Sequence, residues 1–291
     1  AASDVYKRQG KGGVSIMAGK ISKERTISGV VLVILALATI LPGGPILAIT
    51  LYIISNIAFL ELTKACGIHT GEKPNALEIT GFLAIAVYYL LIYFAQTPTY
   101  FMITVILLLM VLMSVYVLTF PKFTANQVMT TYFCLIYAPV MLSFIFLTRQ
   151  LPYGIYLVWM IFISSWISDT CAYLVGVMIG KHKLAPVLSP KKSIEGSVGG
   201  ILGSAIVGAV FGFFLIDKTL GGHQYGTMLC IIGGIGSVIS QIGDLAASAI
   251  KRNHDIKDYG KLIPGHGGIM DRFDSVIFTA PMIYFLIILF L

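Results

Sequence analysis

The chain has 291 residues and a formal net charge of +7, from 20 Lys and Arg against 13 Asp and Glu. Hydrophobic residues make up 57% of the chain, charged residues only 11%, and the mean hydropathy is +0.89. A soluble domain carries about 25% charged residues, so this composition excludes an ordinary soluble domain and indicates an integral membrane protein. Its apolar runs are therefore read as membrane spans of about 20 residues.

The N-terminal stretch AASDVYKRQGKGGVSI (1–16) has neither an apolar period nor the hydrophobic region of a signal peptide. We expect residues 1–16 to be a cloning remnant or a disordered tail outside the fold. Nine apolar spans follow, and each is predicted to be a helix, because a helix satisfies its own backbone in lipid. The spans are Ile27–Leu41, Pro45–Leu62, Ile79–Ala95, Tyr100–Phe120, Met129–Leu147, Gly154–Gly180, Gly196–Ile216, Gly226–Ile250 and Ser275–Leu291.

The predicted fold class is an all-α polytopic integral membrane protein with about nine transmembrane helices. Residues 17–150 would hold helices 1–5, and residues 151–291 would hold helices 6–9. If the N-terminus is cytoplasmic, only two of the 20 Lys and Arg residues, Arg149 and Lys218, lie outside. The positive-inside rule therefore predicts a cytoplasmic N-terminus, an external C-terminus and cytoplasmic loops at 181–195 and 251–274. The net positive charge is explained by this topology, so no nucleic-acid partner is needed.

Two aspartates, Asp169 and Asp244, fall within predicted spans. An ionised Asp at the centre of a span costs about 2.5–3.5 kcal/mol on insertion scales, so it needs a partner or a wet cavity. Polar residues at steps of three and four share the helix face of Asp244: Ser237, Gln241, Ser248 and Lys251. Such a stripe faces protein or water rather than lipid. The structural alternative is a carboxylate that only fixes helix packing, but two such residues favour a functional site.

Small residues repeat at every fourth position in the seventh and eighth spans. The two sets are Gly196, Gly200, Ser204, Gly208 and Gly212, and Gly236, Ser240, Asp244 and Ser248. Such ladders let helices approach closely in membranes, so we interpret the glycines as structural.

The first cytoplasmic loop, KHKLAPVLSPKKSIEGS (181–197), carries four lysines and ends at the start of a helix. Ser193 and Glu195 could simply cap that helix, with the lysines holding the topology. Free N–H groups at a helix start beside Lys191 and Lys192 would also form an anion site suited to phosphate. Both interpretations stay open for this loop alone.

The second loop, SAIKRNHDIKDYGKLIPGHGGIMDRFD (248–274), is richer in chemistry. Asp271 and Asp274 are three residues apart, so both carboxylates share one face if the last helix begins there. The glycines around His266 let the backbone approach a ligand closely. Magnesium prefers one or two carboxylates together with substrate phosphates. Positive charge for those phosphates comes from Lys251, Arg252, Lys257, Lys261 and Arg272. The loop therefore predicts a site for a metal and a polyphosphate.

The second loop resembles the signature of the phosphatidate cytidylyltransferases, also called CDP-diacylglycerol synthases. The positions that carry the resemblance are Ser248, Lys251, Arg252, Lys257, Asp258, Gly260, Pro264, His266, Gly267, Gly268, Asp271, Arg272 and Asp274. The upstream stretches SDTCAYLVG and LSPKKSIEG are also similar to that family's motifs. The specific match covers the part of the chain from SDTCAYLVG onward, whereas the first five spans show only generic hydropathy.

The resemblance implies a reaction in which CTP and phosphatidic acid give CDP-diacylglycerol and pyrophosphate. It also implies Mg²⁺, with a second cation left open, a homodimer, and a multi-pass location in the cytoplasmic membrane with the site facing the cytoplasm. The expected metal ligands are Asp169, Asp244, Asp271 and Asp274. The expected catalytic residues are Lys251, His266, Asp271 and Arg272. The expected substrate-binding residues are Lys192, Ser193, Glu195, Lys251, Arg252, Lys257, Gly267 and Gly268.

Two alternatives use the same residues differently. A related CTP-dependent transferase could act on an isoprenoid glycerol phosphate or a polyprenol. A cation-coupled transporter could use Asp169 and Asp244, although it would not need the Lys-, Gly- and His-rich loop, and no internal repeat is detectable. At 1.5 Å per residue, Asp169 lies about 18 Å along its helix from Lys181. The site therefore requires either a wet funnel into the membrane or helices that project beyond the lipid.

Overall fold

The structure is a computed structural model that describes residues 29–95, 98–220, 225–263 and 267–290. In these ranges, eight helices are long and apolar enough to cross a membrane, and each coincides with one of the last eight predicted spans. The first predicted span is helical over Gly29–Ile40, a shorter apolar helix, so the count of nine spans stays a prediction. The tail at 1–16 and His266 lie outside the described residues.

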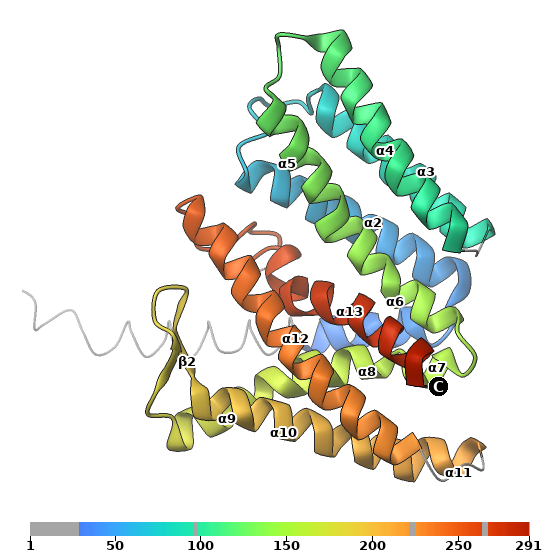
Figure 1. The fold of residues 1–291 in the computed structure, drawn as a ribbon, viewed down its shortest axis with the longest axis vertical. Helices are drawn as coiled ribbons and strands as arrows, with labels where there is room; N and C mark the ends of the chain where they lie inside the picture. The colour runs from blue at the N-terminus through green and yellow to red at the C-terminus, as the bar shows by residue number, and fades with distance from the viewer. Residues whose placement is uncertain (1–28, 96–97, 221–224, 264–266, 291) are drawn as a thin grey trace, which may run out of the picture.

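The N-terminal half is a bundle of helices joined by short turns (Figure 1). Its elements are α2 (Gly44–Ala65), α3 (Ala76–Phe94), α4 (Pro98–Thr119), α5 (Ala125–Leu135), the π-helical segment η1 (Ile136–Val140) and α6 (Met141–Gln150). Polar residues at the helix starts satisfy the free N–H groups: Asn75 and Glu78 form a capping box on α3. Pro139 lies in η1, where its missing N–H interrupts the helical ladder, so one predicted span is built from α5, η1 and α6.

The C-terminal half contains the predicted spans six to nine, again with π-helical segments inside two of them. Its helical elements are α7 (Gly154–Leu157), α8 (Trp159–Phe162), η2 (Ile163–Ile167), α9 (Ser168–Ile179), α10 (Ile194–Phe211), η3 (Gly212–Ile216), α11 (Asp217–Leu220), α12 (Tyr225–Asn253) and α13 (Met270–Phe290). In Figure 1, α12 runs diagonally across α10 and lies beside α13. The predicted loop at 251–274 is therefore shorter in the structure, since α12 continues to Asn253 and α13 begins at Met270.

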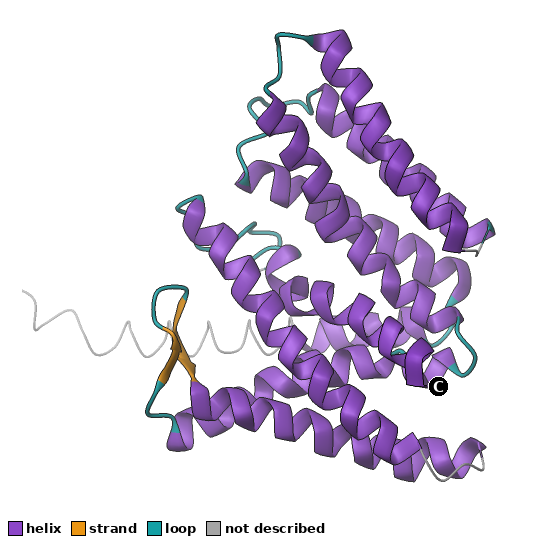
Figure 2. Ribbon diagram, viewed as in Figure 1, coloured by secondary structure: helices purple, strands orange, loops and turns teal. Residues whose placement is uncertain are grey.

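The predicted loop at 181–195 contains a small two-stranded sheet that was not predicted from the sequence (orange in Figure 2). Strands β1 (Lys183–Ala185) and β2 (Ser189–Ser193) pair antiparallel, with Lys183 opposite Ser193. Pro190 is tolerated in β2 because a two-stranded sheet consists only of edge strands. The Glu195 carboxylate links the start of α10 to the residues before β1. It accepts the backbone N–H of Lys181 at 3.1 Å and contacts His182 Nδ1 at 2.6 Å.

Small residues bring the C-terminal helices together, as their spacing predicts. Gly196, Gly200, Ser204 and Gly208 form the buried face of α10. A methyl group added at Gly208 would overlap the carbonyl oxygen of Leu229 on α12. Because no side chain separates the helices at such points, the polar residues that they carry are held at close range.

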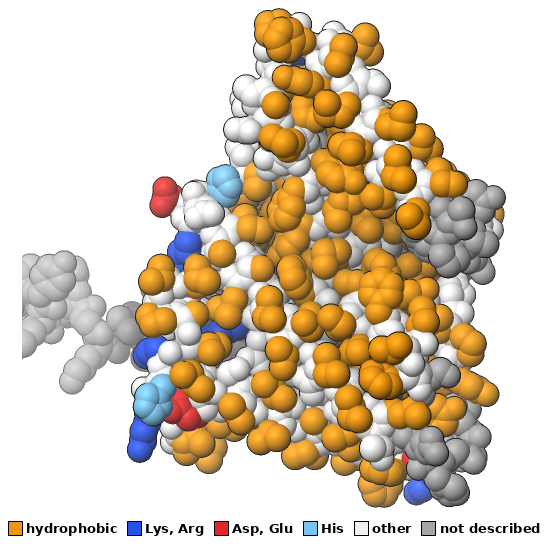
Figure 3. Space-filling view, viewed as in Figure 1, with side chains coloured by type: hydrophobic (Ala, Val, Ile, Leu, Met, Phe, Trp, Pro, Cys, Tyr) orange, Lys and Arg blue, Asp and Glu red, His pale blue; other side chains and the backbone are white. Residues whose placement is uncertain are grey.

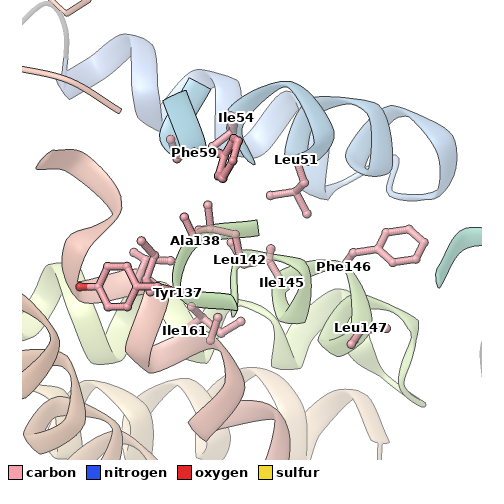
Figure 4. Close-up of a cluster of buried hydrophobic side chains, with 14 of the residues drawn as sticks. Leu51, Ile54, Phe59, Tyr137, Ala138, Leu142, Ile145, Phe146, Leu147 and Ile161 are labelled. Carbon is pink, nitrogen blue, oxygen red and sulfur yellow. The ribbon is translucent and has the colours of Figure 1, made fainter. Parts of the chain in front are cut away.

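The apolar core of the N-terminal half lies between α2 and the α5–α6 segment (Figure 4). Leu51 and Phe59 of α2 face Ala138, Leu142 and Ile145, and all five side chains are at most 3% exposed. This packing gives α2 a fixed position against the rest of the bundle.

Most visible Lys and Arg side chains gather along the edge of the molecule where the hairpin lies (left in Figure 3). The end of α13 lies on the opposite side (Figure 1). This distribution agrees with the charge asymmetry in the sequence, while the orientation in the membrane stays a prediction.

Single cysteines at Lys191, Lys257 and Lys218 test that orientation, since all three lysines are exposed. We expect cysteines at 191 and 257 to react only with reagents that reach the cytoplasm, and a cysteine at 218 to react only from outside. The measurement is labelling of intact cells with a membrane-impermeant maleimide. Labelling of positions 218 and 257 from the same side would contradict the predicted topology.

Candidate active site at the junction of two cavities

Two cavities meet at Asp169 on α9 and Asp244 on α12, and both aspartates line both of them. We call them the hairpin cavity, of about 570 Å³, and the deep cavity, of about 620 Å³. The sequence left open how Asp169, far along its helix from the cytoplasmic loop, could join the other residues. In the structure, Asp169 joins the other site residues because it lines both cavities.

The hairpin cavity lies between the β-hairpin, α9, α10 and α12. Its lining is rich in cations and hydroxyls: Lys183, Ser189, Lys191, Lys192, Ser193 and Ser197. Ser193 also caps α10, because its Oγ accepts the backbone N–H of Gly196 at 3.1 Å. The structural and the ligand-binding interpretations of Ser193 are therefore compatible. Three lysines and three hydroxyls can neutralise and hydrogen-bond a polyanion.

The deep cavity has two parts of different chemistry. One wall is apolar and comes from the helix Gly29–Ile40 and from α2, with Leu32, Ala36, Leu47 and Leu51 among its residues. The other end is charged and is lined by Asp169, Asp244, Lys251, Asp258, Asp271, Arg272 and Asp274. Asp271 and Asp274 both line it because α13 begins at Met270, which places them on one face of its first turns. An amphipathic molecule with a charged head and an apolar body matches this lining.

Ion pairs hold two of the aspartates. Lys192 Nζ pairs with Asp244, and Lys251 Nζ donates to Asp271 Oδ1 at 2.9 Å. The second oxygen of Asp271 accepts the backbone N–H groups of Tyr259 at 2.8 Å and Gly268 at 3.0 Å. Asp271 therefore organises the loop before α13, and both of its oxygens already have partners.

Tyr259 fixes the same loop against α12. Its hydroxyl donates to the Ala247 carbonyl oxygen at 2.9 Å, and its ring lies 5.4 Å from Lys251 Nζ. Burial raises the pKa of Tyr259 well above the usual range, so its hydroxyl stays protonated and keeps this bond.

The polar stripe predicted on α12 faces protein along its length. Ser237 Oγ lies 2.7 Å from Ser168 Oγ on α9, and Gln241 Nε2 donates to the Ser197 carbonyl oxygen at 3.1 Å. Further along the stripe, Asp244 and Lys251 make the ion pairs described above. Ser237, Gln241 and Ser248 are buried, so the prediction that this stripe faces protein is confirmed for them.

The carboxylates at the junction are hard oxygen ligands, which suit Mg²⁺. In the described part of the chain, no three His, Cys, Asp or Glu side chains are placed to hold one metal ion by themselves. Magnesium usually takes one or two carboxylates and completes its shell with water and substrate phosphates, so Asp169, Asp244 and Asp274 beside a lysine-rich cavity fit that ion.

Some predicted site residues lie apart from the two cavities. Arg252 and Lys257 are exposed and line neither of them, and Glu195 is engaged at the base of the hairpin. Gly267 has φ of +83°, a conformation that favours glycine, so its role here is in the backbone turn. The roles proposed for these residues stay predictions.

Glu61 was not predicted from the sequence; it is a buried carboxylate near the end of α2 that contacts the loop before α13. Its signal was an acidic residue inside a predicted apolar span, the same signal that identified Asp169 and Asp244. Lys183 and Ser189 were not predicted as site residues either, because only the hairpin brings them to the cavity.

Known proteins resemble this chain over most of its length. A model of the cytidylyltransferase family matches residues 23–290. The phosphatidate cytidylyltransferase of Staphylococcus saprophyticus is 35% identical over 269 residues, covering 91% of this chain and 99% of that protein. The enzymes of the same name from Staphylococcus aureus and Staphylococcus haemolyticus are 34% identical over 272 and 269 residues, with the same coverage. The similarity thus extends well beyond the C-terminal motifs, into the helices that had shown only generic hydropathy. The chain belongs to the cytidylyltransferase family.

Proposed function

We propose that this protein transfers the cytidylyl group of CTP to phosphatidic acid, giving CDP-diacylglycerol and pyrophosphate for phospholipid biosynthesis. One observation carries the proposal beyond family membership: a lysine-rich cavity and a cavity with an apolar wall share Asp169 and Asp244. A water-soluble polyphosphate and a membrane lipid can therefore meet at the same pair of carboxylates.

The hairpin cavity is the proposed site for CTP. Lys183, Lys191 and Lys192 neutralise the triphosphate, and the Ser193 hydroxyl lies beside them. When phosphate replaces the carboxylate as the partner of Lys192, Asp244 becomes available to a cation. The hairpin thus binds phosphates as a phosphate-binding loop does, but with side chains carried on two paired strands.

The deep cavity is the proposed site for phosphatidic acid. An acyl chain lies along the apolar wall formed by the helix Gly29–Ile40 and α2, and the phosphate head lies near Lys251 and Arg272. Arg272 Nε is buried and has no hydrogen-bond partner among the described residues, so a phosphate oxygen would satisfy it.

The transfer needs positioning more than a protein base. A phosphate oxygen of phosphatidic acid forms a bond to the α-phosphorus of CTP, while the bond from that phosphorus to the oxygen bridging to the β-phosphate breaks. Pyrophosphate leaves with the electron pair, and the attacking phosphate is already ionised at neutral pH. Lysines and Arg272 neutralise the phosphates and hold them in line. Bound Mg²⁺, held by Asp244 with Asp169 or Asp274, would offset the charge that develops on the phosphates, and a second cation stays open.

The cellular setting follows from the same proposal. In this proposal the protein spans the cytoplasmic membrane, and the hairpin lies on the cytoplasmic side, as the positive-inside rule predicts. The homodimer implied by the family resemblance is also part of the proposal.

Purified protein in detergent with radiolabelled CTP, phosphatidic acid and Mg²⁺ tests the function. We expect a labelled lipid product that requires all three components, and no exchange of pyrophosphate into CTP without the lipid, because attack is direct. The measurement is thin-layer separation of the lipid products.

The same assay separates the alternatives. Labelled product from an isoprenoid glycerol phosphate or a polyprenol, with none from phosphatidic acid, would overturn the assignment of the lipid. Cation-driven solute uptake into vesicles without CTP, with no labelled lipid, would favour a transporter.

A further inference from the structure

Glu61, near the end of α2, contacts residues more than 200 positions away in the sequence. Its carboxylate oxygens accept the backbone N–H groups of Ile269 at 3.1 Å and Met270 at 2.9 Å. These groups lie at the start of α13, where N–H groups have no partner within the helix and the helix dipole favours negative charge. The residue is only 8% exposed, so water does not compete strongly for these bonds.

Glu61 and Asp271 divide the N–H groups of this helix start between them. Asp271 accepts the N–H of Gly268, and Glu61 accepts those of the next two residues, Ile269 and Met270. Three consecutive N–H groups are therefore held by two carboxylates from different parts of the chain. One of these carboxylates faces the deep cavity, whereas Glu61 lines neither cavity.

Two glycines of the signature leave room for Glu61. A methyl group added at Gly260 or at Gly268 would overlap the Glu61 carboxylate. The loop is therefore shaped around this side chain at Gly260 and Gly268.

We propose that Glu61 is a positioning residue for the transfer reaction, acting through the start of α13. It fixes the first turn of α13 and so sets where Asp271, Arg272 and Asp274 stand relative to Asp244 on α12. This inference rests on the proposed function. It assigns a role in the reaction to the N-terminal half, whose α2 is held by the packing against α5–α6.

The test compares Glu61→Gln with Glu78→Gln. Glu78 is a matched control because it is also a buried carboxylate at a helix start, bonded to Asn75 N at 3.0 Å and His69 Nδ1 at 2.9 Å. These bonds lie at the connection between α2 and α3, whereas those of Glu61 reach the start of α13. Glutamine keeps the size of the Glu61 side chain, but its NH₂ group would face one of the two backbone N–H groups that the carboxylate now accepts, so that hydrogen bond is lost.

A displacement of about 1 Å in a reacting group can cost about 100-fold in rate, so we expect kcat of Glu61→Gln to fall about 10- to 100-fold. The KM for CTP should stay within about twofold, because the hairpin cavity is untouched. Glu78→Gln should lower thermal stability and leave the kcat of the folded protein within about twofold of wild type.

Hydrogen exchange gives a readout without substrate. The amides of residues 268–270 should lose protection in Glu61→Gln and keep it in Glu78→Gln. Glu61→Asp, whose shorter chain reaches one amide less well, should fall between wild type and Glu61→Gln in both kcat and protection.

A double-mutant cycle tests the contact with the loop. Gly268→Ala should lower kcat because its methyl group meets the Glu61 carboxylate. Adding Glu61→Asp should cost little more, since the shorter side chain relieves the overlap, whereas independent sites would multiply their losses.

Wild-type kcat in Glu61→Gln, or losses that match those of Glu78→Gln and follow only the folded fraction, would overturn the proposal. Multiplicative losses in the Gly268→Ala and Glu61→Asp cycle would do the same. If wild-type protein made no CDP-diacylglycerol while the amides of 268–270 still lost protection in Glu61→Gln, the proposed function would fail, and the structural link between α2 and α13 would stand.

Discussion

Asp244→Asn is expected to lower turnover at least about 100-fold while leaving membrane insertion and folding intact, since its charge is what a metal would need. Asp244 lines both cavities and pairs with Lys192, so it stands where the two substrates are proposed to meet. Asparagine keeps the size of the side chain and can still accept a hydrogen bond from Lys192. The measurement is kcat with CTP and phosphatidic acid over a range of Mg²⁺ concentrations, together with the melting temperature.

Asp217→Asn provides the control. Asp217, the first residue of α11, accepts the N–H of Tyr225 at 3.1 Å and lines neither cavity, so its replacement should leave turnover near that of wild type. Near-normal turnover in Asp244→Asn would remove this residue from the proposed metal site.

Asp271→Asn is expected to lower both turnover and stability. Its side chain is 3% exposed and pairs with Lys251, which is 12% exposed. Removing one partner of a buried ion pair leaves an unpaired charge and costs about 3–5 kcal/mol, so the melting temperature should fall clearly. Turnover should fall about 100-fold beyond the loss of folded protein, because the head of the lipid loses its fixed surroundings. The measurements are thermal unfolding and kcat of the folded fraction.

The double variant Asp271→Asn with Lys251→Met separates these two effects. It removes both charges, so part of the lost stability should return. Turnover should stay low, because the charged end of the deep cavity has lost two of its groups. Recovery of turnover together with stability would show that Asp271 has only a structural role.

The sequence predicted the helices well because membrane spans are long, apolar and bounded by charge. The ends moved by a few residues, mainly where capping residues such as Asn75 extended a helix beyond its apolar run. The hairpin at 183–193 was not predicted because three- and five-residue strands containing Lys and Pro have no apolar alternation. The π-helical segments likewise leave no pattern that hydropathy can detect.

The candidate site was predictable where its residues lie in one motif, and less so where they come from different helices. The spacing of Asp271 and Asp274 predicted that they share a face, and both line the deep cavity. No pattern within one segment could show that Lys192 pairs with Asp244, or that Glu61 reaches Met270, because these contacts depend on how helices cross. The sequence motif also includes residues that lie outside the cavities: Arg252 and Lys257 are exposed and line neither of them.

The apolar wall of the deep cavity has an energetic consequence for a lipid substrate. Moving an acyl chain into water costs about 0.8 kcal/mol for each CH₂ group, on the order of 10 kcal/mol for a chain of common length. A chain that lies along the helix Gly29–Ile40 and α2 exchanges one apolar surrounding for another. The phosphate head can then reach Asp244 and Arg272 while the acyl chains stay in an apolar environment. The product, which has a larger head group, can return to the bilayer by the same path. The free-energy barrier to exchange of lipid substrate and product would then come from separating the helices that line the cavity, because the acyl chain is never exposed to water.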